Sequence, residues 1–322
     1  MNRRVPPLKT YSHLAGERRM PSEYEIVTTK LLYHPQRGFE IDVPTRGWYE
    51  KHQRGARLTC RDWERFADPR ATTYPDYTTL QARQENHLEG VLRSWAAADH
   101  DPALLALWRD TFLRVLAPLR FALHGFQMIA AYVGQMAPSG RIAIAALLQT
   151  ADELRRVHRL AYHLGLYRKL QPSRDTSRSD WQTAPAWQPL RRVVEQALAT
   201  YDWSEALVAL DLCLKPLLEA LFFTELARLA REQHDFLLGE VLSSFDEDGR
   251  WHQAWSAALV RLAVEEPDNR RLLREWVDRW WPRAREAAAA AAPLLGEAGD
   301  HSPLGRAEAR AREHLRALEL EP

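Results

Sequence analysis

The strongest constraint on the fold is a helical repeat of apolar residues that starts at Tyr77 and continues through most of the chain. Over residues 78–98 apolar side chains recur every three or four positions, as expected for one face of a helix. Pro102 suits the first turn of a second helix. Residues 119–136 are apolar on nearly all sides, which predicts a helix buried by its neighbours. This half of the chain is therefore expected to be helical.

The second half repeats this layout. After a helix expected to end near Leu166, a polar stretch (171–185) separates the two halves. Helical segments are then predicted over 187–201, 203–234 and 236–266, with a possible kink at 246–249. Another helix should start after Pro267, with Asp268 or Asn269 as its N-cap, and a charged helix over 303–320 closes the chain. The prediction is an all-α protein of about ten helices.

Residues 1–77 differ from this pattern, and we expect them to form an extended N-terminal arm preceding a helical domain (78–322). They hold seven prolines and ten aromatic residues but no sustained helical period. Disordered tails are usually poor in aromatics, so the arm should pack on a surface, either of its own domain or of another subunit. Residues 23–35 could pair as a short strand. The side chains predicted to make the contact are Tyr11, Tyr24, Tyr33, Trp48, Tyr49, Trp63 and Phe66.

Composition narrows the class of protein. Lys and Arg number 44 against 43 Asp and Glu, which gives no general attraction to nucleic acid or to a membrane. Two cysteines are too few for a disulfide framework and favour a reducing compartment. No apolar run approaches the ~20 residues that cross a bilayer, and residues 1–20 lack the apolar core of a signal peptide. We expect a soluble, cytoplasmic protein without nucleic-acid or membrane partners.

The long helices carry a pattern of carboxylates and histidines that could form a metal site. A four-helix di-iron bundle takes one Glu from each of two helices and Glu-x-x-His from each of the other two. In "ADELRR" Glu153 has the position of the glutamate, but Arg156 stands where the histidine should be. A guanidinium has no lone pair to donate and would repel iron. His158 is five residues past Glu153 and falls on a different face.

The second half has lost ligands in the same way. In "DEDGRWH" His252 is retained, but Gly249 occupies the glutamate position, with Asp248 beside it. Near the pairing position of the preceding helix stand Lys215 and Pro216, with Glu219 and Glu225 further along. The sequence predicts a degenerate metal site at Glu153, Arg156, Gly249 and His252. Arg156 should instead form an ion pair with Glu153, with His252 or His124 close by.

The sequence resembles a known family, the β subunits of the hydroxylase component of bacterial multicomponent monooxygenases, in the toluene, alkene and isoprene monooxygenase branch. The resemblance is carried by "TYSHLAGERRMPSEYEIVTTKLLY", "CRDWERFADPRATTY", "FQMIAAYVGQMAPSG", "LQTADELR", "YDWSEALVALDLCLKP" and "ALVRLAVEEPDN". These segments lie between residue 10 and about residue 270, so they cover most of the chain.

The resemblance implies a ferritin-like helical bundle, related to that of ribonucleotide reductase, with additional helices. It implies a non-catalytic subunit with no cofactor of its own, because the di-iron centre of this family lies in the α subunit. The expected assembly contains two α, two β and two γ chains. An NADH-dependent reductase, a Rieske ferredoxin and an effector protein would serve it in the hydroxylation or epoxidation of an aromatic hydrocarbon or alkene.

Two other functions stay open from the residues alone. The chain could be a stand-alone carboxylate oxidase with an atypical ligand set around Glu153, His158, Asp248 and His252. It could also be a helical interaction module unrelated to oxygen chemistry, with the Trp-rich segment 274–284 as its binding face. The twelve tryptophans of the chain fit an interface, although helix packing explains them as well.

Overall fold

The computed structural model describes residues 14, 21–29, 43–97, 104, 106–170, 176–296 and 302–322. Helices dominate all of these ranges except the shortest, and no strand occurs in them. The all-α prediction is confirmed. Within the described helices, none combines the length and the apolar character needed to span a membrane.

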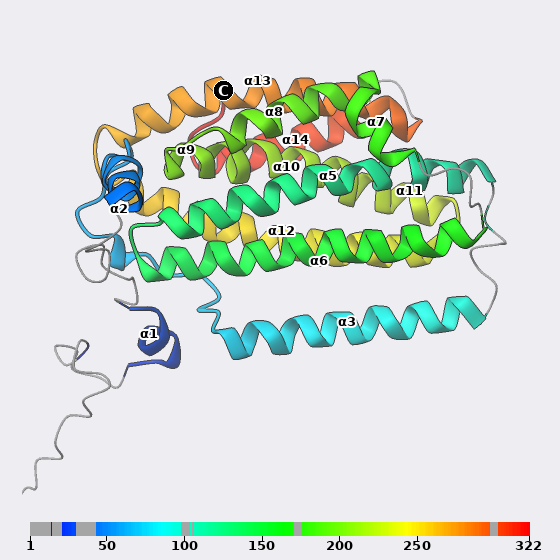
Figure 1. Cartoon of the computed structure of the whole chain (residues 1–322), viewed down its shortest axis with the longest axis horizontal. Helices are drawn as coiled ribbons and strands as arrows, with labels where there is room; N and C mark the ends of the chain where they lie inside the picture. The colour runs from blue at the N-terminus through cyan, green and yellow to red at the C-terminus, as the bar shows by residue number, and fades with distance from the viewer. Residues whose placement is uncertain are drawn as a thin grey trace, which may run out of the picture.

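Four long helical segments form the centre of the molecule (Figure 1). The first two are α5 (Ala106–Met136) and α6 (Gly140–Leu170), which lie side by side and antiparallel. The third is continuous in sequence and comprises α9 (Trp203–Leu207), the π-helical turn η5 (Val208–Leu214), α10 (Lys215–Glu219), the π-helical turn η6 (Ala220–Glu225) and α11 (Leu226–Glu232). The fourth is α12 (Phe236–Ala263), which packs against α11, α10 and α6.

Shorter and peripheral helices cover this centre. On one side lie α7 (Ser177–Thr183), the 3-10 turn η4 (Pro185–Trp187), α8 (Gln188–Leu198), α13 (Asn269–Ala291), the 3-10 turn η7 (Ala292–Leu295) and α14 (Pro303–Arg316). On the other side α3 (Tyr74–Ala97) packs on α12. The Trp-rich segment on α13 is not an exposed binding face, because Trp276, Trp280 and Trp281 are all buried in the core. Their large apolar area is used in helix packing.

Helix boundaries follow the sequence with some differences. The helix predicted after Pro267 does start with Asp268 at its N-cap, although the Asp268 side chain makes no capping hydrogen bond. Residues 106–136 form one uninterrupted helix, α5, which contains Pro118. α12 likewise runs through 246–249 without a break. Burial on most sides holds both helices together across residues that would weaken an isolated helix.

The prediction of a strand over 23–35 is wrong in its described part. Residues 23–28 form a short helix, α1 (Glu23–Thr28), that starts with a capping box between Ser22 and Glu25. The capping box satisfies free backbone N–H groups at the helix start, a local signal that outweighs the apolar alternation of "YEIV". The helix α2 (Val43–Tyr49), the π-helical turn η2 (Glu50–Arg54) and the 3-10 turn η3 (Trp63–Arg65) follow along the chain.

The predicted contact residues of the arm divide into three groups. Tyr24 and Phe66 are buried by the chain itself, and the hydroxyl of Tyr24 accepts a hydrogen bond from the backbone N–H of Asp68. Tyr49 and Trp63 are half-buried against the core, whereas Trp48 is 40% exposed. Tyr11 and Tyr33 lie outside the described residues. An intersubunit role for the arm stays a prediction, and Trp48 is the most exposed of its described contact residues.

Candidate functional site

α6 supplies one face of polar residues to the interior of the bundle. Gln149, Asp152, Glu153 and Arg156 follow one another at spacings of three, one and three, so all four project from the same side of the helix. Each of them is almost fully buried. Burying ionised groups costs free energy unless they are paired, so this face requires partners on the neighbouring helices.

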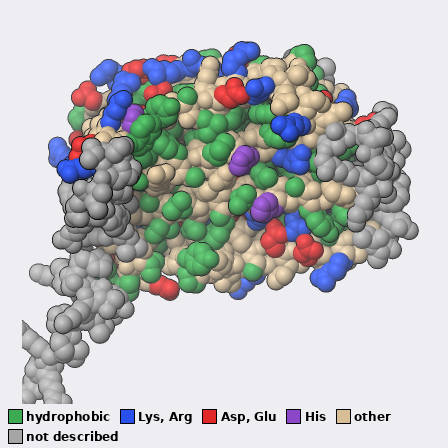
Figure 2. Space-filling view, viewed as in Figure 1, with side chains coloured by type: hydrophobic (Ala, Val, Ile, Leu, Met, Phe, Trp, Pro, Cys, Tyr) green, Lys and Arg blue, Asp and Glu red, His purple; other side chains and the backbone are tan. Residues whose placement is uncertain are grey.

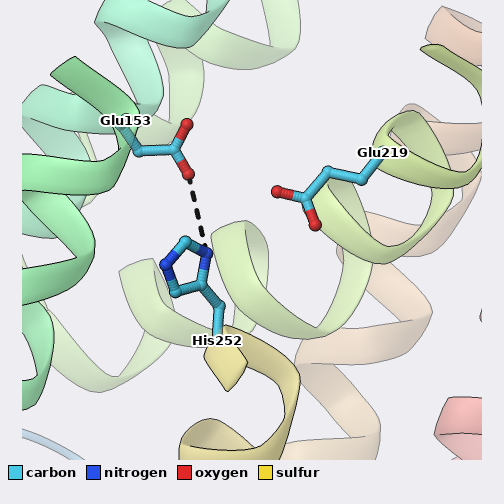
Figure 3. Close-up of side chains that lie close together, drawn as sticks. All are labelled: Glu153, Glu219 and His252. Carbon is cyan, nitrogen blue, oxygen red and sulfur yellow. Dashed lines mark ion pairs between the residues drawn. The ribbon is translucent and has the colours of Figure 1, made fainter. Parts of the chain in front are cut away.

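α10 and α12 provide those partners (Figure 3). Lys215 and Glu219, four residues apart on α10, are both buried. α10 lies between the π-helical turns η5 and η6, and such wider turns change the direction of the side chains that follow. His252 on α12 is buried opposite. The carboxylates of Glu153 and Glu219 and the imidazole of His252 point toward a common space.

Two cations bridge the two glutamates in that space. Arg156 Nη1 donates to Glu153 Oε1 at 2.9 Å and to Glu219 Oε1 at 2.6 Å. The Lys215 ammonium donates to the same oxygen of Glu219 at 2.7 Å and also to Glu153 Oε1. A second guanidinium nitrogen of Arg156 donates to the backbone carbonyl of Phe245. We call Glu153, Arg156, Lys215 and Glu219 the ion-pair cluster. Its two positive and two negative charges balance.

The surroundings keep the cations of the cluster charged. Burial alone would lower the pKa of both Arg156 and Lys215, but the adjacent carboxylates of Glu153 and Glu219 outweigh it and raise both pKa values above their ordinary range. Arg156 and Lys215 therefore stay protonated in the folded chain. The pair of Arg156 with Glu153 that the sequence predicted is confirmed.

Gly249 fits the cluster because it has no side chain. A Cβ atom at this position would overlap Glu219 Oε2 and would lie 3.5 Å from Arg156 Nη2. The position where the metal-binding pattern expects a glutamate is thus filled from the opposite helix by the carboxylate of Glu219. Here glycine is required by the close approach of a charged side chain rather than by the backbone conformation.

A hydrogen-bonded group around Asp152 adjoins the cluster. Asp152 accepts from the Tyr77 hydroxyl at 2.7 Å and from the Gln81 amide at 2.8 Å, and its other oxygen lies 2.9 Å from His252 Nε2. Burial, followed by the charge of Asp248, raises the pKa of Asp152. Burial and the nearby cations Lys215 and Arg156 lower the pKa of His252. Both pKa shifts disfavour the charged forms of these two groups, whose Asp152 Oδ2 and His252 Nε2 atoms lie at hydrogen-bond distance.

Four side-chain atoms of the cluster and of His252 have no hydrogen-bond partner: Glu153 Oε2, Arg156 Nε, Glu219 Oε2 and His252 Nδ1. Glu153, Glu219 and His252 are also the one group in the described part of the chain whose potential ligand atoms lie within 4.8 Å of one another. A di-iron centre nevertheless does not fit these residues. Arg156 and Lys215 already neutralise both carboxylates, so each added metal ion would bring uncompensated positive charge beside two fixed cations.

Comparison with known proteins places this chain in a family. The sequence profile of the methane/phenol/alkene hydroxylases matches residues 44–267, which is more than half of the chain. The β subunit of the hydroxylase component of the toluene-4-monooxygenase system from Ectopseudomonas mendocina is 36% identical over 90% of this chain and 91% of its own length. The chain belongs to the methane/phenol/alkene hydroxylase family.

Other members support the assignment. The hydroxylase component small subunit of propane 2-monooxygenase from Mycolicibacterium goodii is 26% identical over 91% of this chain and 82% of its own length. A solved structure of toluene 4-monooxygenase, with toluene in its resting active site, contains a chain that superposes with a TM-score of 0.85 and 36% identity. The superposition covers 91% of this chain and 99% of that one. The ferritin-like helical fold is therefore that of the hydroxylases.

The remaining candidate residues differ in how close they lie to the ion-pair cluster and in how deeply they are buried. The prediction that His252 or His124 lies close to the Arg156–Glu153 pair is confirmed by His252, which lies beside the cluster, whereas His124 is exposed on α5. His158 is also exposed, which excludes it from a ligand set with Glu153. Asp248 is buried but pairs with Arg155. The helical spacing already separated His158 from Glu153, and burial confirms that separation.

Lys215 is the residue whose role the sequence did not reveal. The sequence pattern only places Lys215 near the pairing position of a missing ligand, whereas in the structure it bridges both glutamates. The available signal was a single lysine within the apolar run from Ala206 to Phe223, four residues before Glu219. A lysine in such a run must be buried with a carboxylate partner.

Proposed function

We propose that this chain is the non-catalytic, structural β subunit of the hydroxylase in a multicomponent monooxygenase, and that oxygen activation takes place at a di-iron centre in a separate α subunit. The observation that carries the proposal is the pair of cations, Arg156 and Lys215, bridging Glu153 and Glu219. Lysine and arginine there supply the positive charge that the carboxylates need. The chain consequently has the helical bundle of the hydroxylases but binds no metal in it.

The relatives support a subunit role. Their names describe a β subunit and a small subunit of hydroxylase components, and this chain covers 82–91% of their length. A helical interaction module unrelated to oxygen chemistry is not favoured by such a match. A stand-alone carboxylate oxidase is not favoured either, because His158 is exposed and Asp248 pairs with Arg155.

The wider assembly follows from the same proposal. The chain would join α and γ subunits in a cytoplasmic α2β2γ2 hydroxylase. A reductase would supply this hydroxylase with electrons from NADH through a Rieske ferredoxin, and an effector protein would regulate it. The relatives act in toluene and propane monooxygenases. We propose an aromatic hydrocarbon or an alkene as the substrate, bound in the α subunit.

Coexpression with the neighbouring genes tests this function. The chain should copurify with a larger subunit that carries two intact Glu-x-x-His motifs, and the reconstituted system should oxidise toluene or an alkene with NADH. Iron analysis should assign about two irons to each larger subunit and none to this chain purified alone. Two irons bound to the isolated chain, or oxidation by the chain without its partner, would overturn the proposal.

A further inference from the structure

The helix α3 differs from the other long helices in how little of it is buried. Among residues 74–95, whose side chains the structure describes, only Leu88 and Leu92 are buried. The helix α12, which is of similar length, buries more than half of its 28 residues. In Figure 1 α3 is the outermost of the long helices, on the side of α6 away from α5. Elements with few buried contacts open at a lower free energy than the rest of a protein.

The first half of α3 meets the bundle through polar side chains. Tyr77 donates a hydrogen bond to Asp152, and the amide of Gln81 donates to both Asp152 and Asp248. The amide of Gln84 is buried, but neither of its polar atoms has a hydrogen-bond partner in the described part of the chain. A buried amide without a partner costs free energy. This half of the contact is therefore weaker than an apolar one of the same size.

Ion pairs hold the middle of α3 to α6. Glu85 pairs with Arg155 at 2.9 Å and also with Arg159, and Glu89 pairs with Arg159 at 2.8 Å. The side chains of Glu85 and Glu89 are 32% and 47% exposed. Figure 2 shows acidic and basic side chains next to one another in the lower part of the view, where α3 adjoins α6. Salt screens ion pairs that water reaches, so this part of the contact should weaken as the salt concentration rises.

Open grooves flank α3 on both sides. Toward α6 a groove of about 550 Å³ is lined by residues that include Glu85 and His158. Toward α12 a second groove, of about 200 Å³, is lined by residues that include Gln84 and Ser244. Water can therefore enter along both edges of α3, and little additional apolar surface becomes exposed when the helix leaves the bundle.

The segment before α3 is attached more firmly than the helix itself. The buried carboxylate of Asp68 accepts hydrogen bonds from the indole N–H of Trp251 on α12 and from the backbone N–H groups of Arg70 and Thr72. We call Asp68 and Trp251 the anchor. Ala71 follows with a φ of 48°, a left-handed conformation that turns the chain into α3. The helix α3 can therefore leave the bundle while the chain before it stays in place.

We propose that α3 is a strap that leaves α6 and α12 as one unit, from the anchor onward, while the four long helical segments stay folded. This inference does not depend on the proposed function. A helix of this length without packing partners is marginally stable in water, so the released strap unwinds. Release exposes Asp152 and Asp248, and it opens a path for water to His252 beside the ion-pair cluster. Salt shifts the balance toward the open form, because it screens the pairs of Glu85 and Glu89.

Amide hydrogen exchange of the full-length chain, followed by mass spectrometry at constant pH, tests the inference. Peptides from residues 74–97 should exchange about tenfold faster than peptides from α12, because only the strap has to open. In ~1 M salt, where the Debye length falls to ~3 Å, the exchange of residues 74–97 should be faster by a further factor of about three. The exchange of α12 should stay the same in both salt concentrations.

Two variants should change the exchange of α3 in opposite directions. Glu85→Gln removes the ion pairs with Arg155 and Arg159, so α3 should exchange faster and respond less to salt. Gln84→Met keeps the length of the side chain and removes the unpartnered amide, so α3 should exchange more slowly. Glu195→Gln is the matched control, because it breaks an ion pair with Arg191 on α8 and should leave the exchange of α3 unchanged.

Three results would overturn the inference. The first is exchange of residues 74–97 that is as slow as that of α12 in both salt concentrations. The second is an equal acceleration of α3 and α12 by salt, because it would indicate unfolding of the whole chain rather than release of the strap. The third is unchanged exchange of α3 in both Glu85→Gln and Gln84→Met, because the contacts of these side chains would then not hold the helix.

Discussion

Removing the Arg156 side chain should lower the stability of the folded chain. Arg156→Ala leaves Glu153 and Glu219 buried with one cation between them, and breaking a buried pair costs ~3–5 kcal/mol because the remaining charge is uncompensated. The free energy of unfolding measured in urea should fall by about that amount. The yield of assembled hydroxylase should fall too, while the iron content per catalytic subunit stays constant.

Arg271→Ala is the control for this prediction. Arg271 forms an ion pair with Asp268 at 3.8 Å, and both side chains are largely exposed. Exposed pairs contribute ~0–1 kcal/mol because water and salt screen them. If Arg156→Ala cost no more than Arg271→Ala, the ion-pair cluster would not be a source of stability.

The buried carboxyl group of Asp211 predicts that the free energy of unfolding depends on pH. Burial raises its pKa to about 7, whereas an aspartate in the unfolded chain has a pKa of ~3.9. Between these values the folded chain holds a proton that the unfolded chain has released, so this residue makes the free energy of unfolding fall as the pH rises from ~4 to ~7. Asp211→Asn removes the titration and can still accept the hydrogen bond from Gln149 Nε2, which is 2.7 Å long in the unmodified chain.

Urea denaturation of both proteins at pH 5, 6 and 7 measures this effect. The unmodified chain should lose stability relative to Asp211→Asn across the series. Two curves that run parallel over this range would refute a raised pKa for Asp211.

At this scale the sequence predicted charge pairs along one helix but not those between helices. The pair of Glu153 with Arg156 follows from their spacing of three residues. The bridges from Lys215 to Glu153 and from Arg156 to Glu219 depend on how α10 is rotated about its axis. That rotation follows from the π-helical turns on either side of α10, and a regular period of 3.6 residues does not reveal them.

Among the helices, α3 and α12 offer a matched pair of glycines. Gly90 lies inside α3 with nothing within 4 Å of its added Cβ atom, whereas the Cβ at Gly249 in α12 would overlap Glu219. Alanine is favoured over glycine in a helix by ~1 kcal/mol. Gly90→Ala should therefore raise the free energy of unfolding by up to about 1 kcal/mol. Gly249→Ala should lower it, because Glu219 would have to leave its bonds to Lys215 and Arg156.

Thermal or urea unfolding of the two variants compares them directly. Equal stabilisation by both would show that Glu219 moves aside without cost. In that case the ion-pair cluster would not require a glycine at position 249.

The helices themselves could largely be predicted, because long apolar repeats determine which faces are buried. The short elements could not. The alternation in "YEIV" suggested a strand, but the capping box of Ser22 and Glu25 starts a helix there. Pro118 does not interrupt α5 either, because burial around the helix offsets the missing hydrogen bond. Tertiary packing, which single-sequence patterns do not contain, determines both outcomes.

For the whole molecule, the N-terminal arm gives a further prediction. Deleting residues 1–46 should leave a helical chain that no longer holds the catalytic subunit, and hydrocarbon oxidation should fall with the lost complex. The physical reason is that an aromatic-rich segment without a core of its own needs apolar surface to cover. Gel filtration and an oxidation assay of the coexpressed complex measure both effects.

A shorter deletion, of residues 1–20, serves as the comparison. It leaves in place the buried Tyr24 and its hydrogen bond to Asp68, and so separates loss of packing within the chain from loss of partner contacts. Full activity and an unchanged elution volume with the longer deletion would show that the arm only covers its own subunit.

The ion-pair cluster also determines what a substitution toward a metal-binding pattern would cost in stability. Arg156→His alone would leave two buried carboxylates with one cation, and Gly249→Glu alone would force a third carboxylate against Glu219. Each change that restores a ligand is destabilising until the others are present. A metal-binding pattern at these positions would therefore require replacements at 156, 215 and 249 together, and each single replacement is expected to lower the free energy of unfolding.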